Sequence, residues 1–296
     1  MKKNIILVVN PISGDVDKSE LIEAVTLFAA NVNLNLIIFN TSGASDLENI
    51  QVLYETYHPE RIIVAGGDGT IKMVAEAMEN YDVIIGILPA GSANGLAVDL
   101  NLPTTIEENL EIVFHNDYME IDMIAINGKK SIHLSDLGVN AEMIKNYENS
   151  TIRGKLGYAI QTFTTLIDLD DPFTARITGD FKTIECTARM IVIANSQKYG
   201  TGVTINPNGA MDDGKFELVI LKNLDLVVLG KIISGNMPLD SVDVEIISTD
   251  KATVSTNVPV SFQIDGEYCG SETNLNIEIL PKQLKVAISN TNSGII

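Results

Sequence analysis

Short, almost wholly apolar runs alternate with helix-like segments over the first 115 residues of the chain. The apolar runs are rich in β-branched residues and lie at 4–9, 34–39, 61–65 and 83–88. Helix-like segments lie between them, at 19–30, 46–57 and 71–80. Strands that are buried on both faces of a parallel sheet have this composition, because helices cover both sides of the sheet. The pattern therefore predicts an α/β domain made of βαβ units.

The pattern changes near Tyr118, after which strand-like runs dominate. Asn127-Gly128 between two such runs is a strong signal for a hairpin. Further strands are expected at 173–178, 184–195, 216–222, 242–248, 252–264 and 274–280. Helices are expected at 141–149, at 154–167 and in the apolar segment 224–235. We predict a second domain that is antiparallel and β-rich, with the boundary between residues 1–122 and 123–285.

Charge and composition narrow the class of partner. The 296 residues hold 20 Lys and Arg against 39 Asp and Glu, a formal net charge of −19. Nucleic acid is therefore an unfavourable partner, because its phosphates are neutralised by basic side chains. Contact with an anionic membrane is expected to be weak or transient for the same reason. A small basic island within 123–160 either meets phosphates or is chance variation on a surface.

Nothing in the sequence predicts export. The N-terminal apolar run spans only residues 5–9, which is too short for a signal peptide or a membrane span. Cys186 and Cys269 give neither a disulfide framework nor the spacing of metal ligands. A cytoplasmic location is expected, and the sequence leaves a homodimer open.

A glycine-rich turn, Gly66-Gly67-Asp68-Gly69-Thr70, joins the third predicted strand to a helix. Bare backbone lets N–H groups approach phosphate oxygens, and the helix N-terminus adds partial positive charge. A carboxylate beside phosphates is repulsive unless it faces a cation, so Asp68 is predicted to organise Mg²⁺, directly or through water. The plainer alternative is a tight turn in which Thr70 is the N-cap.

Two other loops of small residues follow the first and fourth predicted strands, NPISG (10–14) and PAGSANGLA (89–97). Ligands of open α/β sheets gather at the carboxyl ends of the strands, where all three loops are expected. Side chains that are able to hydrogen-bond phosphate or ribose are Asn10, Ser13, Ser92 and Asn94. Each of them taken singly is more often a turn residue. Together the three loops predict a nucleotide site.

These three motifs, in this order and spacing, resemble the diacylglycerol kinase catalytic domain family, which includes bacterial soluble lipid kinases and the sphingosine kinases. The second half of the chain adds DLGVNAEMI, RGKLGYA, MDDGKFELVIL and FQIDGEY. The resemblance implies an α/β nucleotide domain and a β-sandwich-like domain, with the active site in the cleft between them. It also implies that a final segment, about 286–296, returns to the first domain.

The resemblance implies an ATP-dependent lipid kinase with Mg²⁺. The γ-phosphoryl group would go to a primary hydroxyl of a lipid such as diacylglycerol or a sphingoid base. Nucleotide contacts would fall on Thr41, Ser92, Gly66, Gly67, Asp68, Gly69, Thr70, Ile71 and Lys72. A divalent cation would be held by Asp213 with the backbone carbonyls of Ala210 and Lys215. The catalytic base would be Glu267, with Asp68 as the second catalytic residue.

Without the resemblance, Asp265-Gly266 is a hairpin turn with Glu267 as the next residue, and 212–214 is a surface turn. GGDGT by itself is shared with NAD kinases and, loosely, with phosphofructokinases. An NAD kinase-like small-molecule kinase is therefore one alternative. A regulatory module that binds a nucleotide without turnover is another.

The chain departs from the family pattern at two places. Bacterial members commonly have a GTxND-type loop followed by an arginine, and here Ser92, Gly95 and Val98 stand at those positions. GSANGLA resembles the sphingosine kinase version, which leaves the lipid open. A lysine often follows the first loop, whereas Asp15 stands here and Lys18 is the nearest lysine.

Overall fold

A computed structural model divides the chain into two compact units, Met1–Ile121 with Lys282–Ile296, and Asp122–Pro281. We call them unit 1 and unit 2. The structure describes residues 2–15, 17–115, 117–138, 141, 172–180, 182–199, 202–224, 228, 231–232, 234–235 and 242–289. The predicted helices at 141–149 and 154–167, most of the predicted helix at 224–235, the RGKLGYA motif and most of the basic island lie outside these residues.

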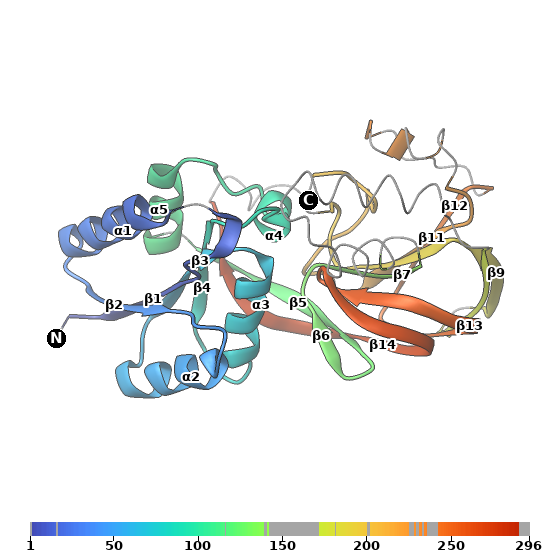
Figure 1. Cartoon of the computed structure of the whole chain (residues 1–296), viewed down its shortest axis with the longest axis horizontal. Coiled ribbons are helices and arrows are strands. Elements are labelled where there is room, and N and C mark those ends of the chain that lie inside the picture. The colour runs from blue at the N-terminus through green and yellow to red at the C-terminus, as the bar shows by residue number, and fades with distance from the viewer. Residues whose placement is uncertain are drawn as a thin grey trace. The chain divides into compact units, whose positions relative to one another are not determined.

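Unit 1 contains a parallel sheet, as predicted (Figure 1). Its strands are β1 (Asn4–Val9), β2 (Asn35–Asn40), β3 (Arg61–Gly66) and β4 (Ile84–Pro89), with the end of β14 (Glu267–Ala287) beside β4. The order across the sheet is β14-β4-β3-β1-β2, and every neighbouring pair is parallel. β1 and β3 are buried along almost their whole length, which explains their continuous apolar sequences.

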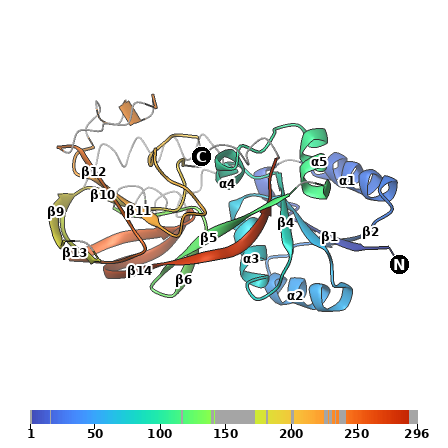
Figure 2. The ribbon, with the colours of Figure 1, turned by 180° about the vertical axis from the view of Figure 1, so that it is seen from behind.

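Helices cover both faces of this sheet (Figures 1 and 2). They are α1 (Ser19–Asn31), α2 (Asp46–Tyr57), α3 (Asp68–Ala77), α4 (Gly95–Asp99) and α5 (Ile106–His115). One buried cluster joins α1 and α5 to the sheet through side chains that include Val25, Val113 and Phe114. α2 and α3 lie on the opposite face.

α3 begins three residues earlier than the apolar pattern predicted. Gly67 is the N-cap, and Asp68 is already the first helical residue. The alternative that made Thr70 the N-cap is wrong, because Thr70 lies inside the helix and is buried. Its N–H donates to the Gly67 carbonyl at 2.9 Å. The spacing of apolar residues could not predict this start, because the N-cap and the second helical residue are glycines.

Unit 2 is antiparallel and β-rich, as predicted. Its strands are β5 (Tyr118–Ile126, which begins in unit 1), β6 (Lys129–Ser131), β7 (Leu134–Gly138), β8 (Phe173–Gly179), β9 (Ile184–Ala188), β10 (Met190–Ala194), β11 (Phe216–Leu221), β12 (Val244–Thr249), β13 (Lys251–Ile264) and most of β14. The main path is β12-β11-β10-β7-β13-β14, and β8 continues from β13 to β9. β11 sends Phe216 and Leu218 into one buried cluster and Val219 into another, so both of its faces are covered.

Two strand predictions in this unit were wrong in extent. The run 184–195 is two strands, because β9 pairs with β8 while β10 pairs with β7 and β11. The strand expected at 274–280 is β14, which begins at Glu267 and continues to Ala287. Its first residues are polar and mostly exposed, so they lack the alternation by which strands are recognised.

The hairpin at Asn127-Gly128 is confirmed. Ile126 pairs with Lys129, and both turn residues have positive φ, 49° at Asn127 and 81° at Gly128. This geometry is that of a two-residue turn matched to the twist of the strands.

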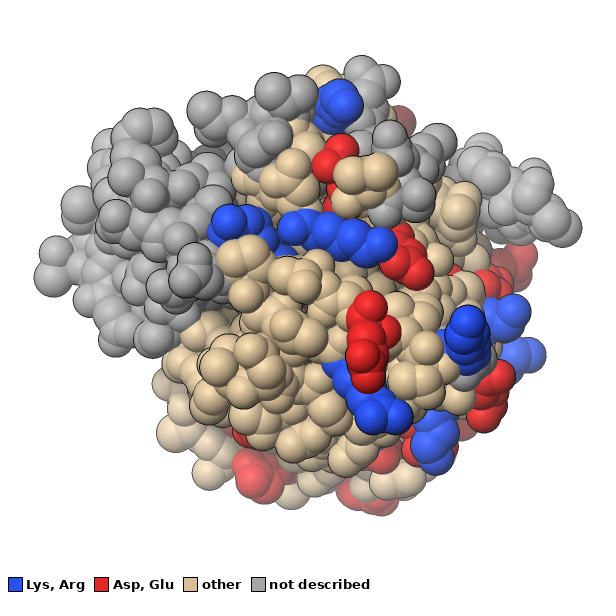
Figure 3. Space-filling model, turned by 90° about the vertical axis from the view of Figure 1, so that its right-hand side faces the viewer, with Lys and Arg blue, Asp and Glu red and all other residues tan. Residues whose placement is uncertain are grey.

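Within the described part of the chain, no helix is long and apolar enough to cross a membrane. On the face seen in Figure 3, the basic and acidic side chains of the described residues are interspersed among broad neutral areas. Neither sign of charge gathers into one large patch on that face.

Candidate functional site

Three loops of unit 1 come together at the carboxyl ends of β1, β3 and β4. The Asn10 N–H donates to the Ala65 carbonyl at 3.0 Å, and the Ala90 N–H donates to the Gly66 carbonyl at 2.9 Å. The Ser13 hydroxyl crosses from the first loop to the Ala90 carbonyl at 2.9 Å. The convergence expected from the order of the motifs is therefore present in the fold.

Glycines let these loops approach closely. A Cβ added to Gly91 would lie 2.4 Å from the Gly67 Cα, and a Cβ added to Gly14 would lie 2.9 Å from the Ala90 carbonyl oxygen. A Cβ on Gly66 would meet the Thr70 hydroxyl oxygen at 2.6 Å. Loop packing alone therefore requires bare backbone here, in addition to any requirement of a bound phosphate.

Asp68 joins the glycine turn to the third loop. Its carboxylate accepts the Gly95 N–H at 2.8 Å and the Leu96 N–H at 3.0 Å, one on each oxygen. These N–H groups belong to the first turn of α4, where they have no intrahelical acceptor. The carboxylate thus caps α4, a role that the sequence did not suggest, and its cation role stays a prediction.

Replacing Asp68 by Asn is expected to destabilise unit 1 by about 1.5–3 kcal/mol, because one of the two charge-assisted bonds to α4 is lost. The loss should persist in EDTA, since capping requires no metal. Urea denaturation with and without Mg²⁺ measures the loss of stability. ATP titration under the same two conditions measures any loss of ATP affinity. A loss that appears only with Mg²⁺ present would show instead that the main role of Asp68 is to organise the cation.

The other side chains predicted at the nucleotide site are held mainly by one another. The Asn10 amide donates to the Thr70 hydroxyl at 3.1 Å. Asn94 folds back on Gly91, accepting its N–H at 2.7 Å and donating to its carbonyl at 3.1 Å. Ser92 is exposed. These residues therefore shape the loops, and their contacts with a nucleotide stay predictions.

The remaining positions of the glycine turn differ in what they offer a ligand. Ile71 is buried in the core, and its N–H donates to the Gly67 carbonyl at 3.1 Å. Its side chain is therefore a packing group. Gly69 is exposed and Lys72 is half-buried. Lys18, noted near the first loop, is buried and its ammonium donates to the Ser13 carbonyl.

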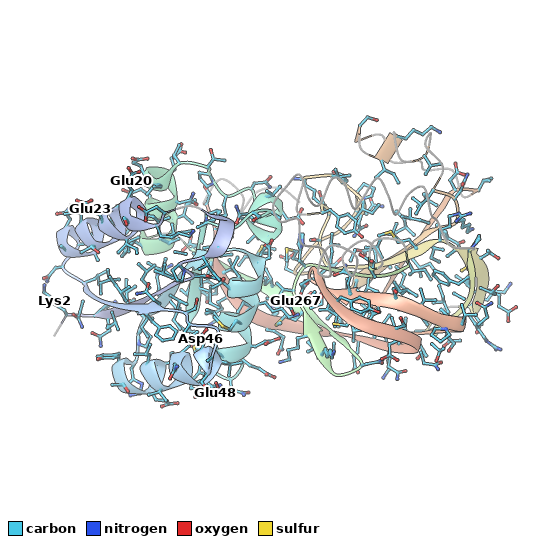
Figure 4. The ribbon with its side chains drawn as sticks, in the orientation of Figure 1. Lys2, Glu20, Glu23, Asp46, Glu48 and Glu267 are labelled. Carbon is cyan, nitrogen blue, oxygen red and sulfur yellow. The ribbon has the colours of Figure 1, made fainter. Side chains whose placement is uncertain are left out.

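Thr41 begins a loop that is organised by a carboxylate the sequence reading missed. The Thr41 N–H donates to the Val9 carbonyl at 2.8 Å, which places this loop beside the end of β1. Asp46, at the start of α2, accepts the Ser42 N–H at 2.9 Å and the Gly43 N–H at 2.7 Å (Figure 4). An Asp that follows Ser and Gly at a helix start was the available signal.

The pKa of Asp46 lies below its ordinary value. Burial disfavours the charged form, but the N–H groups of Ser42 and Gly43 and the Ser42 hydroxyl outweigh it. The stability that this carboxylate contributes is therefore present above pH 3.8, its ordinary pKa, and is lost as pH falls through the lowered value. Asp46→Asn should lower the melting temperature at pH 7. It should also make the fall in melting temperature at acid pH smaller than in the wild type. Thermal melts of both proteins from pH 7 to about pH 2 test this, and an equal loss at acid pH in the variant would contradict it.

In unit 2, Glu267 lies at the start of β14, directly after the turn that joins it to β13 (Figure 4). The turn residues have positive φ, 48° at Asp265 and 88° at Gly266. Glu267 pairs with Ile264 across the turn, and its side chain is exposed. An exposed carboxylate at the end of a rigid hairpin is chemically suited to accept a proton from a hydroxyl group.

The predicted cation turn in unit 2 is held by Asp122, which sequence reasoning also missed. Asp122 is buried, and its carboxylate accepts the Gly214 N–H at 2.7 Å. Asp213 is exposed, and one of its oxygens accepts the Lys215 N–H at 2.9 Å. A carboxylate with the carbonyls of Ala210 and Lys215 is a set of hard oxygen ligands, which suits Mg²⁺ or Ca²⁺. Among the described residues, no three His, Cys, Asp or Glu side chains are grouped to hold a metal.

Two family models match the chain, one for each half. The model described as diacylglycerol kinase catalytic domain matches residues 4–126. The model described as YegS C-terminal NAD kinase beta sandwich-like domain matches residues 135–288, more than half of the chain. The chain therefore belongs to the family that has this YegS C-terminal domain, and its first part, residues 4–126, matches the diacylglycerol kinase catalytic domain. The family identification made from the motifs is confirmed.

Family relatives are similar to this chain over most of its length. A protein named Diacylglycerol kinase from Staphylococcus carnosus is 25% identical over 281 residues, covering 91% of this chain and 90% of its own. A protein named Probable lipid kinase YegS from Escherichia fergusonii is 28% identical over 232 residues, covering 76% of each. A crystal structure of a diacylglycerol kinase from Bacillus anthracis covers 98% of both chains, with a TM-score of 0.77 and 20% identity. This likeness confirms the predicted fold class.

Proposed function

We propose that this chain is an ATP-dependent lipid kinase, which transfers the γ-phosphoryl group of ATP to a primary hydroxyl of a lipid such as diacylglycerol or a sphingoid base. The observation that carries the proposal is the convergence of the three small-residue loops at the start of α3. Backbone N–H groups at that edge and the N-terminus of α3 suit the phosphates of a nucleotide.

The residues present fit a nucleotide. The cradle consists of backbone, since the closest loop contacts involve Gly14, Gly67 and Gly91. Asn10 and Asn94 fix the loops through hydrogen bonds within unit 1, so little reorganisation is needed on binding. Thr41 follows the end of β2, and Ser92 lies in the third loop. The hydroxyl groups of both residues suit ribose or phosphate oxygens.

Bound ATP with Mg²⁺ supplies the phosphoryl group and neutralises its charge. The chain then has two tasks, since phosphoryl transfer needs positioning and charge stabilisation more than covalent help. The loops of unit 1 hold the phosphates, and Asp68 keeps the third loop in register with the glycine turn. Glu267 orients the acceptor hydroxyl and takes its proton. Asp213, with the carbonyls of Ala210 and Lys215, would hold a second cation at the turn before β11.

The lipid would be reached through brief contacts with a membrane. A formal net charge of −19 disfavours lasting attachment to anionic lipid. The mixed charges on the face seen in Figure 3 agree with this.

Phosphorylation with radiolabelled ATP tests the proposal. The purified chain is incubated with γ-labelled ATP, Mg²⁺ and, separately, micelles of diacylglycerol or sphingosine, or NAD, and the products are separated by chromatography. We expect label in one lipid and only a trace of it with Glu267→Gln. Label in NAD would support the NAD kinase-like alternative. ATP binding with no labelled product would support a regulatory module, an outcome made relevant by Gly95 and Val98 in the third loop.

A further inference from the structure

A buried polar pair lies directly beneath the turn that carries Glu267. Gln263 on β13 stands opposite Asp136 on β7, and both side chains are almost completely buried, 1% and 0% exposed. The Gln263 amide nitrogen donates to Asp136 Oδ2 at 2.5 Å. The Tyr199 hydroxyl donates to the same oxygen at 3.0 Å. Burying such groups is costly unless they are hydrogen-bonded, so this pair is a built feature of the fold.

The other end of Gln263 reaches the turn itself. Its amide oxygen accepts the Gly266 N–H at 2.7 Å. Only a side chain that donates at one atom and accepts at the next satisfies both partners, because a carboxylate accepts and a backbone N–H donates. Glutamine meets this requirement, whereas glutamate lacks the donor and leucine lacks both groups.

A second attachment holds the turn from its other side. The Asp265 carboxylate accepts the Ser131 hydroxyl at 2.8 Å, the Ile132 N–H at 3.1 Å and the His133 N–H at 3.0 Å. Both residues of the turn are thus tied to the interior of unit 2, Asp265 through its carboxylate and Gly266 through its N–H. Glu267 is the next residue, and the direction of its Cα–Cβ bond is set by this turn.

We propose that Gln263, itself held by Asp136 and Tyr199, is a positioning residue for Glu267. It fixes the Gly266 amide, and through it the backbone from which the Glu267 carboxylate extends. This inference rests on the proposed role of Glu267 as the base. A carboxylate displaced by about 1 Å from a reacting hydroxyl costs on the order of a hundredfold in rate, so fixing this turn has a direct catalytic consequence.

The test begins with Gln263→Leu, which keeps the approximate volume and removes both hydrogen bonds. Hydrogen exchange at the Gly266 amide is expected to quicken by about tenfold, because its acceptor is lost. The kcat is expected to fall by roughly 10- to 100-fold while the KM for ATP stays within about twofold of wild type. The matched control is Ser255→Ala, which removes a 2.8 Å hydrogen bond to Asn274 from the same pair of strands, away from the turn. The control should change neither quantity.

A double variant separates positioning from a general loss of structure. If Gln263 acts through Glu267, then adding Gln263→Leu to Glu267→Gln should lower the residual kcat no further. A further fall of the same size in the double variant would show that Gln263 acts independently and would overturn the inference. So would a folded Gln263→Leu protein with wild-type kcat and wild-type exchange at Gly266.

If Gln263→Leu does not fold, as judged by circular dichroism, Tyr199→Phe decides in the same way. It removes only one donor to Asp136, so about a two- to fivefold fall in kcat and faster exchange at Gly266 are expected. Unchanged values would overturn the inference. A wild-type chain that phosphorylates no lipid would refute the proposed function instead, and exchange at Gly266 would still decide whether Gln263 fixes the turn.

Discussion

Replacing Glu267 by Gln is expected to leave only a trace of phosphoryl transfer to lipid and to leave ATP binding at its wild-type strength. Glutamine has the size of glutamate but cannot take the proton of the acceptor hydroxyl. Removing a general base of this kind typically costs about 10²- to 10⁴-fold in rate. ATP binding should persist because the loops proposed to hold the nucleotide belong to unit 1, whereas Glu267 belongs to unit 2. Labelled lipid product and calorimetric titration with ATP measure the two effects.

The control for this variant lies on the same strand. Glu272 is exposed on β14, and Glu272→Gln makes the same change of charge five residues further along. It should retain wild-type activity. Full activity in Glu267→Gln would refute the role of Glu267 as the base, whatever lipid is phosphorylated.

Replacing Gly91 by Ala should weaken ATP binding strongly. The added Cβ would lie 2.4 Å from the Gly67 Cα and 2.9 Å from the Asn94 side-chain oxygen. Gly91 is not among the residues with positive φ, so its own backbone conformation tolerates alanine and the effect comes from the collision alone. Because the opposing atom is backbone, the third loop must move away from the glycine turn. Overpacking of this kind costs about 1–3 kcal/mol, which corresponds to about a 5- to 150-fold loss of ATP affinity.

Ala93→Ser is the matched control for the third loop, since it adds one atom to an exposed side chain nearby. Its ATP affinity and melting temperature should equal those of the wild type. If Gly91→Ala binds ATP as tightly as the control, then close packing of the third loop on Gly67 is not what forms the nucleotide site.

The sequence predicted the elements of unit 1 well because their patterns are local. β1 occupies the predicted residues 4–9, and α2 the predicted residues 46–57. β1 is a continuous apolar run and α2 is a run of helix-forming residues, and polar residues flank both of them. β14 was predicted too short because its first residues, 267–274, are exposed or half-buried and mostly polar, so they lack a regular apolar alternation.

The sequence could suggest the candidate site only where the residues that form it are adjacent in the chain. The adjacent residues of GGDGT suffice to predict a phosphate-binding turn. The partner of Asp68 at α4 lies 27 residues away and could not be predicted in this way. Gln263 and Asp136 are 127 residues apart and stand in strands that otherwise form the core. Only the register of β13 with β7 brings them together, and this register cannot be predicted from the sequence of either strand alone.

The course of β14 also decides whether unit 1 could be exchanged as a separate module during evolution. The strand starts in unit 2 at Glu267, yet Lys285 and Val286 pair with Ile84 and Ile85 and shield one side of β4. A gene fragment that encodes only residues 1–121 would leave that side of β4 as an open, apolar sheet edge, a template for aggregation. Unit 1 is therefore poorly suited to exchange as a separate module, and recombination is expected to preserve both units together.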